Sequence, residues 1–258
     1  MALDASSIRF IALDLDGTLL RTDKSISDRS RSAIESAQSR GYLPIIATAR
    51  PPRGAAELLD GFLPDAPRIH YSGSHVCIGN DCIHNQTISI ESARATVATL
   101  IDLAPHATVS VEIDDRFYST HPHEHALPGD VVDIRTILDR EPVKIMLDMT
   151  APDLPSDILS HLPSDVRYVL SDSRTLAQIM HADVSKSDAI RRVAETLDGT
   201  LADVMAFGDD TNDIEMIRDS GIGVAMANAV DPVKAVADHI TLSNDDDGVA
   251  ATIEDLLL

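Results

Sequence analysis

Apolar runs that end abruptly in polar residues organise the first part of the chain. Five of the six residues from Ile8 to Leu13 are apolar, and Asp-Leu-Asp-Gly-Thr follows at residues 14–18. A near-continuous apolar run is typical of a parallel strand covered on both faces, and such strands hold ligands beyond their carboxyl ends. The pattern therefore predicts a buried strand that presents Asp14 and Asp16 at a site.

The next elements have the pattern of a βαβ unit. Residues from Ser27 to Arg40 have the periodicity of a helix, and Tyr42 to Ala47 form a second apolar run that ends at Thr48. Because strand, helix and strand make a right-handed parallel unit, Thr48 should lie at the same sheet edge as Asp14. A short helix at 51–60, a strand at 68–72 and a turn-rich hairpin at 75–88 should follow.

The pattern changes between residues 84 and 181. It predicts helices at 92–103, 130–139 and 154–162, and strands at 108–113, 116–120, 143–149, 167–170 and 175–180. This order suits an α+β layer with an open antiparallel sheet. We therefore predict a second domain at 84–181 inserted into a core domain made of 1–83 and 182–258.

Alternation of helix and strand resumes after residue 181. A helix is expected from Ser187 to Leu197, and the buried strand Val204 to Phe207 leads into Gly208 and Asp209. Elements at 214–219, 221–225, 233–237, 240–242 and 249–257 complete the pattern. The predicted fold class is α/β, with a central parallel sheet in the core.

Composition limits the partners. The 258 residues hold 21 Lys and Arg against 42 Asp and Glu, a net charge of −21, which argues against a nucleic-acid backbone or an anionic membrane as partner. No apolar run approaches the roughly 20 residues of a membrane span, and the first residues lack the pattern of a signal peptide. These features predict a cytoplasmic location.

Two groups of potential metal ligands lie outside the strand ends. Cys77 and Cys82 are five residues apart without a second pair, and we expect reduced thiols rather than a disulfide or a zinc site. His121, His123 and His125 alternate as they would on one face of a strand. Because prolines stand at 122 and 128, an exposed loop is the better interpretation.

Four motifs together resemble those of the haloacid dehalogenase superfamily of phosphatases. They are DLDGT at 14–18, Thr48 after a buried strand, Lys186 at the start of a helix, and GDDTND at 208–213. The stretches VSKSDAI, GDDTNDIEMI, GVAMANA and SNDDDGVAATIEDLL resemble the Cof-type hydrolases of that superfamily. The resemblance implies a Rossmann-like core, and the long gap between Thr48 and Lys186 implies a cap of type C2B. Ala49, Ser72 and Ser187 depart from residues common in the family, and none of these departures removes a catalytic group.

The resemblance also implies the roles of the acidic residues. Asp14 would attack phosphorus to form an aspartyl-phosphate, and Asp16 would act first as general acid and then as general base. Mg²⁺ would be held by Asp14, the main-chain carbonyl of Asp16 and Asp209, with Asp213 helping directly or through water. A structural Asp-x-Asp at a strand end is the alternative when that motif is considered alone.

The phosphate site implied by the resemblance combines neutral and cationic donors. Thr48 would donate to phosphoryl oxygens, Lys186 would neutralise their charge, and Asn212 would orient the phosphate or a neighbouring ligand. Arg50 would contact phosphate or form a structural ion pair. Taken alone, Thr48 suits a strand residue and Lys186 a solvated helix start. In so acidic a chain, Mg²⁺, these cations and helix N-termini must supply the positive potential for an anionic substrate.

We therefore predict a Mg²⁺-dependent phosphatase of small phosphorylated metabolites, either sugar phosphates or phosphorylated cofactors such as flavin or pyridoxal phosphates. A phosphotransferase or phosphomutase on the same core is the first alternative, and a non-catalytic sugar-phosphate-binding protein is the second. We expect a monomer or a small homo-oligomer.

Overall fold

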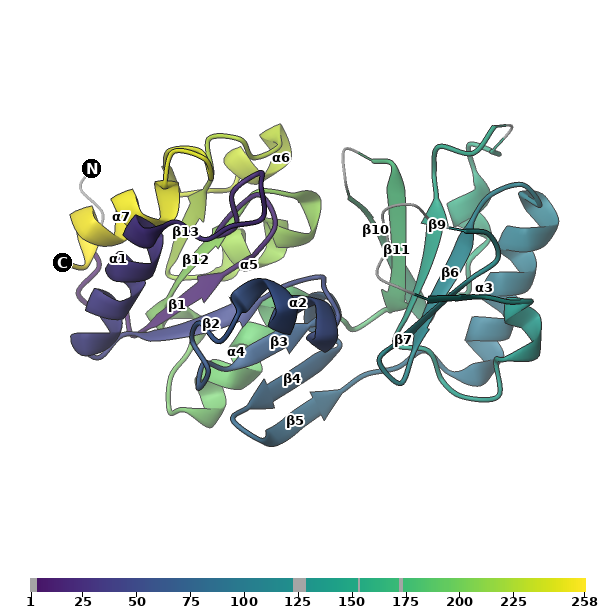
Figure 1. The fold of residues 1–258 in the computed structure, drawn as a ribbon, viewed down its shortest axis with the longest axis horizontal. Coiled ribbons are helices and arrows are strands. Elements are labelled where there is room, and N and C mark those ends of the chain that lie inside the picture. Colours follow the sequence, from purple (N-terminus) through teal and green to yellow (C-terminus); the bar gives the residue numbers. More distant parts are fainter. Residues whose placement is uncertain (1–3, 123–128, 153, 172–173) are drawn as a thin grey trace. The chain divides into compact units, whose positions relative to one another are not determined.

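The chain divides into two compact units. The computed structural model describes residues 4–122, 129–152, 154–171 and 174–258. Unit 1 consists of Met1–His84 with Ser185–Leu258, and unit 2 is Asn85–Val184 (Figure 1). Among the described residues, no helix is both long enough and apolar enough to cross a lipid bilayer.

Unit 1 is built on an eight-stranded sheet in the order β14-β13-β12-β1-β2-β3-β4-β5. The neighbours from β14 to β3 pair in parallel, and β4 pairs antiparallel with β3. The predicted central parallel sheet is therefore present. Its strands are β1 (Phe10–Leu13), β2 (Leu43–Ala47), β3 (Arg68–His70), β4 (His75–Ile78), β5 (Asp81–Asn85), β12 (Val204–Gly208), β13 (Ile222–Ala225) and β14 (His239–Ile240).

Helices cover both faces of this sheet. Two of them, α1 and α7, pack together on one side, and α4 and α5 pack together on the other (Figure 1). The side chain of Ser27 caps α1 by accepting from the Ser30 amide, and Ser185 caps α4 through the Asp188 amide. The helices are α1 (Asp28–Ser39), α2 (Pro52–Leu59), α4 (Lys186–Thr196), α5 (Ile214–Asp219), α6 (Asp231–Lys234) and α7 (Gly248–Leu256), with 3₁₀ turns η1 (Tyr71–Gly73), η4 (Leu201–Asp203) and η5 (Thr211–Asp213).

The central strands form the densest part of the core. Every residue of β1 and of β12 is buried, and Ile11, Leu13 and Phe207 are fully so. Burying each such side chain contributes about 1.5–3 kcal/mol. The carboxyl ends of β1 and β12 are therefore held side by side by a rigid apolar layer.

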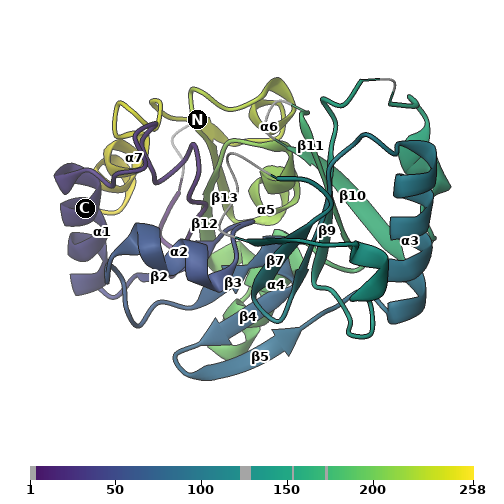
Figure 2. The ribbon, with the colours of Figure 1, turned by 45° about the vertical axis from the view of Figure 1, so that its right-hand side comes forward.

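Unit 2 is a six-stranded sheet in the order β10-β11-β9-β6-β7-β8, with α3 packed against it (Figure 2). Four of its pairings are antiparallel, as predicted, whereas β7 and β8 run parallel. The elements are α3 (Ile90–Leu103), β6 (Val109–Ile113), β7 (Arg116–Ser119), β8 (Gly129–Val131), β9 (Lys144–Asp148), β10 (Val166–Ser171) and β11 (Leu176–His181), with 3₁₀ turns η2 (Ile134–Thr136) and η3 (Ile158–His161).

The helix predicted at 130–139 is wrong. Residues 129–131 form β8 instead, and a single 3₁₀ turn follows. Ile134 and Leu138 are both buried, so their helix-like spacing comes from an irregular segment packed on the core. Asp133 ends the strand by accepting a hydrogen bond from the Arg135 amide, which starts the turn. Of the histidine loop, residues 123 and 125 lie outside the described residues.

The expectation of reduced thiols is also wrong, because the structure contains a Cys77–Cys82 disulfide with an S–S distance of 2.09 Å. Gly79 and Asn80 form the turn between β4 and β5, and Gly79 has a φ of 59° that suits a tight hairpin. This turn brings the two cysteines opposite each other, with their Cα atoms 4.0 Å apart. Two residues five positions apart in the sequence therefore face each other across the two strands of this hairpin.

Candidate active site

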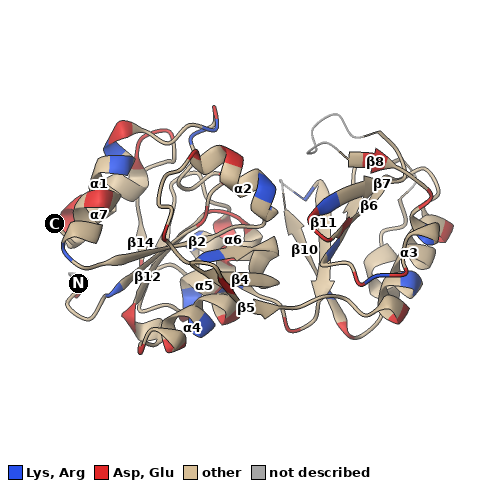
Figure 3. Cartoon of the chain, turned by 60° about the horizontal axis from the view of Figure 1, so that its bottom comes forward, with Lys and Arg blue, Asp and Glu red and all other residues tan. Residues whose placement is uncertain are grey.

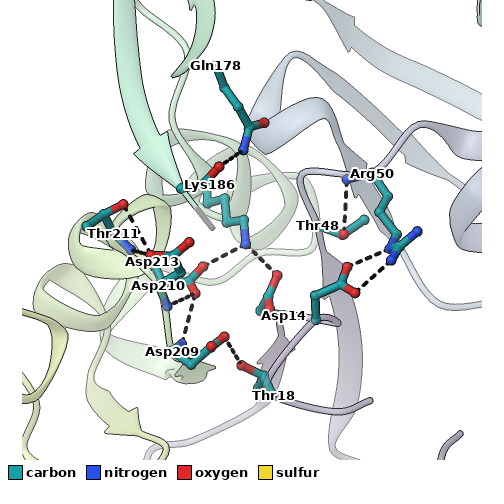
Figure 4. Close-up of polar contacts among 12 residues, drawn as sticks. Asp14, Thr18, Thr48, Arg50, Gln178, Lys186, Asp209, Asp210, Thr211 and Asp213 are labelled. Carbon is teal, nitrogen blue, oxygen red and sulfur yellow. Dashed lines mark hydrogen bonds and ion pairs between the residues drawn. The ribbon is translucent and has the colours of Figure 1, made fainter. Parts of the chain in front are cut away.

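The predicted site residues converge at one edge of the parallel sheet (Figure 4). Asp14 follows β1, Thr48 follows β2, and Asp209 follows β12, so all three lie beyond carboxyl ends of neighbouring strands. Lys186 is the first residue of α4. The sheet thus positions groups that are far apart in the sequence.

Lys186 is a buried cation between two carboxylates. Its Nζ donates to Asp14 Oδ1 at 2.6 Å and to Asp213 Oδ1 at 2.6 Å, and the side chain is fully inaccessible. Burial alone would lower the pKa of Lys186, but the charges and hydrogen bonds of Asp14 and Asp213 outweigh it and raise the pKa. Lys186 is therefore charged and is not a solvated helix start.

Negative charge exceeds positive charge in this buried region. Asp14, Asp209 and Asp213 each offer an oxygen within 4.8 Å of the others, against the one ammonium of Lys186. Burial raises the pKa of Asp14 to about 7 and that of Asp209 to about 9, and the neighbouring carboxylates add to both shifts. Such a cluster needs either protons or a cation. Three hard oxygen donors suit a divalent cation such as Mg²⁺.

Two glycines let the carboxylates approach this closely. Gly17 has a φ of +75°, and a Cβ there would lie 2.2 Å from Asp209 Oδ2. A Cβ on Gly208 would lie 2.5 Å from the Cβ of Asp213. Thr18 Oγ1 donates to Asp209 Oδ1 at 3.0 Å and so fixes that side chain. Glycine at both positions is therefore a steric requirement of the cluster.

The loop after β12 is organised by Asp213. Its Oδ2 accepts from the amides of Asp209 and Asp210 at 3.0 and 3.1 Å, while Oδ1 accepts from Lys186. Both oxygens are thus engaged in holding the loop and the lysine. Asn212 Oδ1 is buried and has no hydrogen-bond partner among the described residues. An amide oxygen can only accept, so this atom suits a cation or a water bound to one rather than a phosphate oxygen.

Asp16 lies in a different environment from Asp14. Arg50 donates to both of its oxygens, from Nε at 2.5 Å and from Nη2 at 2.7 Å, and Lys24 donates at 2.8 Å. Burial alone would raise the pKa of Asp16, but these hydrogen bonds and charges outweigh it and lower the pKa. Arg50 therefore forms an ion pair in this structure, one of its two predicted roles. Its amide also donates to Thr48 Oγ1 at 3.1 Å.

Sequence reasoning assigned no role to three residues at this site. Thr18, which donates to Asp209, is the last residue of the DLDGT motif, so the motif itself could have identified it as a site residue. Asn228 donates from Nδ2 to the Gly17 carbonyl at 2.8 Å, and Lys24 contacts Asp16 from a left-handed turn with a φ of 69°. Asn228 likewise lies inside the GVAMANA stretch, which was a usable signal, whereas Lys24 had none because its contact depends on the left-handed turn.

Charge is distributed unevenly between the surface and the site. Acidic residues are spread over loops and helices in both units (Figure 3), as the net charge of −21 requires. At the site, by contrast, Lys24, Arg50 and Lys186 all contact aspartates. Local cations therefore offset part of the negative charge at this edge of the sheet.

Comparisons with known proteins agree with this geometry. A profile of the haloacid dehalogenase-like hydrolase family matches residues 11–253. The chain is 31% identical to the 5-amino-6-(5-phospho-D-ribitylamino)uracil phosphatase YcsE of Bacillus subtilis (strain 168), over 97% of this chain and 96% of that protein. It is 28% identical to a second phosphatase of that name, YitU, from the same organism, over 95% of this chain and 96% of that one. The crystal structure of TM0651 from Thermotoga maritima superposes with a TM-score of 0.82 at 26% identity, covering 97% of this chain and 98% of that one.

Proposed function

The chain belongs to the haloacid dehalogenase-like hydrolase family, and from that premise we propose that it is a Mg²⁺-dependent phosphatase of small phosphate monoesters. The observation that carries the proposal is the buried contact of Lys186 with Asp14, beside the carboxylates of Asp209 and Asp213. A nucleophilic carboxylate must be ionised although it is buried. Lys186 lowers the pKa of Asp14 against the effect of burial, and so favours the anion.

We assign the attack on phosphorus to the carboxylate of Asp14. Its oxygen forms a bond to phosphorus as the bond from phosphorus to the ester oxygen breaks, which leaves an aspartyl-phosphate and an alkoxide. The alkoxide takes a proton from Asp16. Asp16 then removes a proton from water, which attacks phosphorus and releases inorganic phosphate while Asp14 is restored.

The residues that would hold Mg²⁺ are Asp14, Asp209 and the main-chain carbonyl of Asp16. When bound, the ion supplies positive charge that screens the phosphoryl group from the attacking carboxylate. Because both oxygens of Asp213 already accept hydrogen bonds, we assign it chiefly to positioning Lys186 and the loop. Asn212 Oδ1 supports a cation or its water nearby.

A switch in the partners of Asp16 is required by this mechanism. A general acid needs a proton, yet Arg50 and Lys24 hold Asp16 as an anion in the resting protein. A phosphate dianion competes for the same guanidinium, since Arg binds phosphate and carboxylate with the same fork of donors. We propose that substrate draws Arg50 toward the phosphate, which lets the pKa of Asp16 rise. Thr48 would then donate to a phosphoryl oxygen.

We propose phosphorylated sugars, sugar alcohols or their conjugates as substrates. Two relatives that match nearly the whole chain are named as phosphatases of 5-amino-6-(5-phospho-D-ribitylamino)uracil, whose phosphate sits on a ribityl chain. Phosphorylated cofactors such as flavin mononucleotide and pyridoxal phosphate are also phosphate monoesters, so we include them as candidate substrates. Unit 2 would act as the cap that selects the leaving group, as a C2B cap does.

Phosphate release from a panel of these esters, with and without Mg²⁺, tests the proposal. Wild type should turn over at least one ester only when Mg²⁺ is present, and Asp14→Asn should lose that turnover. Asp60→Asn is the matched control, because it makes the same substitution at an exposed residue, the left-handed C-cap of α2. This variant should keep the turnover. Failure of folded wild type to release phosphate from any ester would refute the proposal.

Product analysis separates the alternatives. A transferase would give a phosphorylated acceptor when a sugar is added in excess, whereas a phosphatase would give inorganic phosphate alone. A pure binding protein would bind an ester without consuming it.

A further inference from the structure

A second group of metal-binding side chains lies on the β4–β5 hairpin. His75 Nε2 is 3.1 Å from Cys77 Sγ and 3.5 Å from Cys82 Sγ. Candidate ligand atoms of all three residues lie within 4.8 Å of one another. These donors are sulfur and imidazole nitrogen, whereas the cluster around Asp14 offers only oxygen.

The pleat of the hairpin directs a fourth candidate donor, His84, to the same face, although its ring nitrogens lie outside the group of three in this structure. Cys77 and Cys82 stand across from each other, two positions from the Gly79-Asn80 turn on either strand. The pleat repeats every two residues, so His75 and His84 form the next cross-strand pair on that face. His84 is half-buried on this hairpin, and helix α4 packs against β3 and β4.

We propose that the hairpin, with its cysteines reduced, binds one Zn²⁺ through Cys77, Cys82, His75 and His84. Two thiolates and two imidazoles make a closed tetrahedral site of the structural type. A tetrahedral ion about 2.3 Å from sulfur and about 2.0 Å from nitrogen separates its ligand atoms by roughly 3.5–3.8 Å. The observed distances of 3.1 and 3.5 Å from His75 Nε2 to the two sulfurs are close to those values, whereas the sulfurs, 2.09 Å apart in the disulfide, would separate on reduction. A disulfide accounts for the two cysteines but gives no reason for two histidines beside them.

The disulfide and the metal site exclude each other, because only thiolates bind the ion. A thiol reductant would supply two electrons and two protons to open the disulfide, and would itself become a disulfide. Zinc would then displace the two thiol protons as it binds. The hairpin therefore has a metal-free oxidised form and a metal-binding reduced form.

Cobalt serves as a visible probe of this site. The reduced full-length protein, freed of metal, is titrated anaerobically with Co²⁺. We expect one equivalent to give the thiolate-to-cobalt charge-transfer band with the absorption of tetrahedral Co²⁺, and Zn²⁺ to displace it. Cys77→Ser and Cys82→Ser should each lose the charge-transfer band or weaken binding by at least ~100-fold. His84→Asn should weaken binding by ~10–100-fold, the range known for disturbing a metal site.

Matched variants keep this test separate from the phosphatase site. Asp209→Asn removes an oxygen donor of the other cluster and should leave the thiolate band unchanged, as should His161→Asn at an exposed histidine of unit 2. If a cysteine variant does not fold, Zn²⁺ protection of both wild-type thiols from alkylation, read by mass spectrometry, gives the same answer. Absence of the band in folded, reduced wild type would overturn the proposal. So would unchanged binding in Cys77→Ser, or unprotected thiols at saturating Zn²⁺.

Discussion

Two groups of residues at the candidate active site control the charge of an aspartate in opposite ways. The inner cluster is Asp14, Asp209, Asp213 and Lys186, in which two buried acids and one half-buried acid share one cation. The outer cluster is Asp16 with Arg50 and Lys24, in which one partly exposed acid has two cations.

Depth of burial and the ratio of acids to cations together set the charge of the aspartate in each cluster. The pKa of Asp14 is raised and that of Asp16 is lowered, although the residues are two apart in one motif. Burial raises both pKa values and is deeper at Asp14, so the cations Arg50 and Lys24 account for the net fall at Asp16. The inner cluster therefore lacks positive charge, as a cation site must, while the outer cluster is already neutralised.

The largest expected effect comes from removing the only cation of the inner cluster. Lys186→Met should leave the three carboxylates of the inner cluster without a counter-charge and lower kcat by about 10³-fold or more. It should also lower the free energy of unfolding by about 3–5 kcal/mol, the usual cost of breaking a buried ion pair. Steady-state kinetics and denaturant unfolding measure the two effects. Lys234→Met, in the last turn of α6, is the control, and wild-type kcat in the Lys186 variant would contradict the assignment.

Asp209→Asn should separate stability from activity. The pKa of Asp209 is raised above its unfolded value, so the stability it contributes is full below about pH 4 and is lost as pH rises toward about 9. At pH 7 without metal, the variant should be more stable than wild type by about 1–3 kcal/mol, yet it should lose Mg²⁺-dependent turnover. Thermal unfolding with a chelator at pH 5 and pH 7 measures this. A variant less stable than wild type at pH 7 would show that the inner cluster is not short of positive charge.

Metal affinity, in contrast to the stability contributed by Asp209, should increase as pH rises. Asp14 and Asp209 must lose protons to bind Mg²⁺, because their pKa values are raised to about 7 and about 9. The dissociation constant should therefore fall as pH rises from 6 to 8, by up to ~10-fold per pH unit for each proton displaced. Calorimetric titration in buffers of different ionisation enthalpy counts those protons. An affinity independent of pH would mean that both acids are already ionised.

The smallest effect is expected in the outer cluster. Arg50→Ala should raise the pKa of Asp16, since one of its two cations is lost, and should shift the pH profile of kcat upward. Lys24→Ala should do the same to a lesser degree because its ammonium is more exposed. Pre-steady-state measurement at several pH values reports the shift. An unchanged profile in both variants would remove Asp16 from the rate-limiting proton transfer.

The sequence correctly predicted those strands and helices in which the hydrophobic periodicity matches the burial of the residues in the structure. The strands β1, β2 and β12 are apolar throughout because both faces are covered, and α1 has a serine cap and one buried stripe. Their ends placed Asp14, Thr48 and Asp209 at one sheet edge. The helix at 130–139 failed because Ile134 and Leu138 pack on a core without being helical.

The electrostatic environment of the site was not predictable from the motifs. The position of Lys24 depends on a left-handed turn, and the pairing of Asp16 with Arg50 joins residues that follow two different strands. The Cys77–Cys82 disulfide was not predicted because the two cysteines meet across a hairpin, which their spacing along the chain does not reveal. Such contacts are set by tertiary structure, which a single sequence reveals only in part.

The register of β1 has a consequence for how the protein is made. Phe10 of β1 pairs with Leu43 on one side and with Val204 on the other. During synthesis, β1 and β2 leave the ribosome long before β12 exists, and all of unit 2 is made in between. The edge of β1 that pairs with β12 stays unpaired during that time. Unpaired edges of apolar strands promote aggregation. The same insertion that enlarges the enzyme thus delays closure of its core until the last quarter of the chain is made, and chaperone binding to β1 would be needed most during that interval.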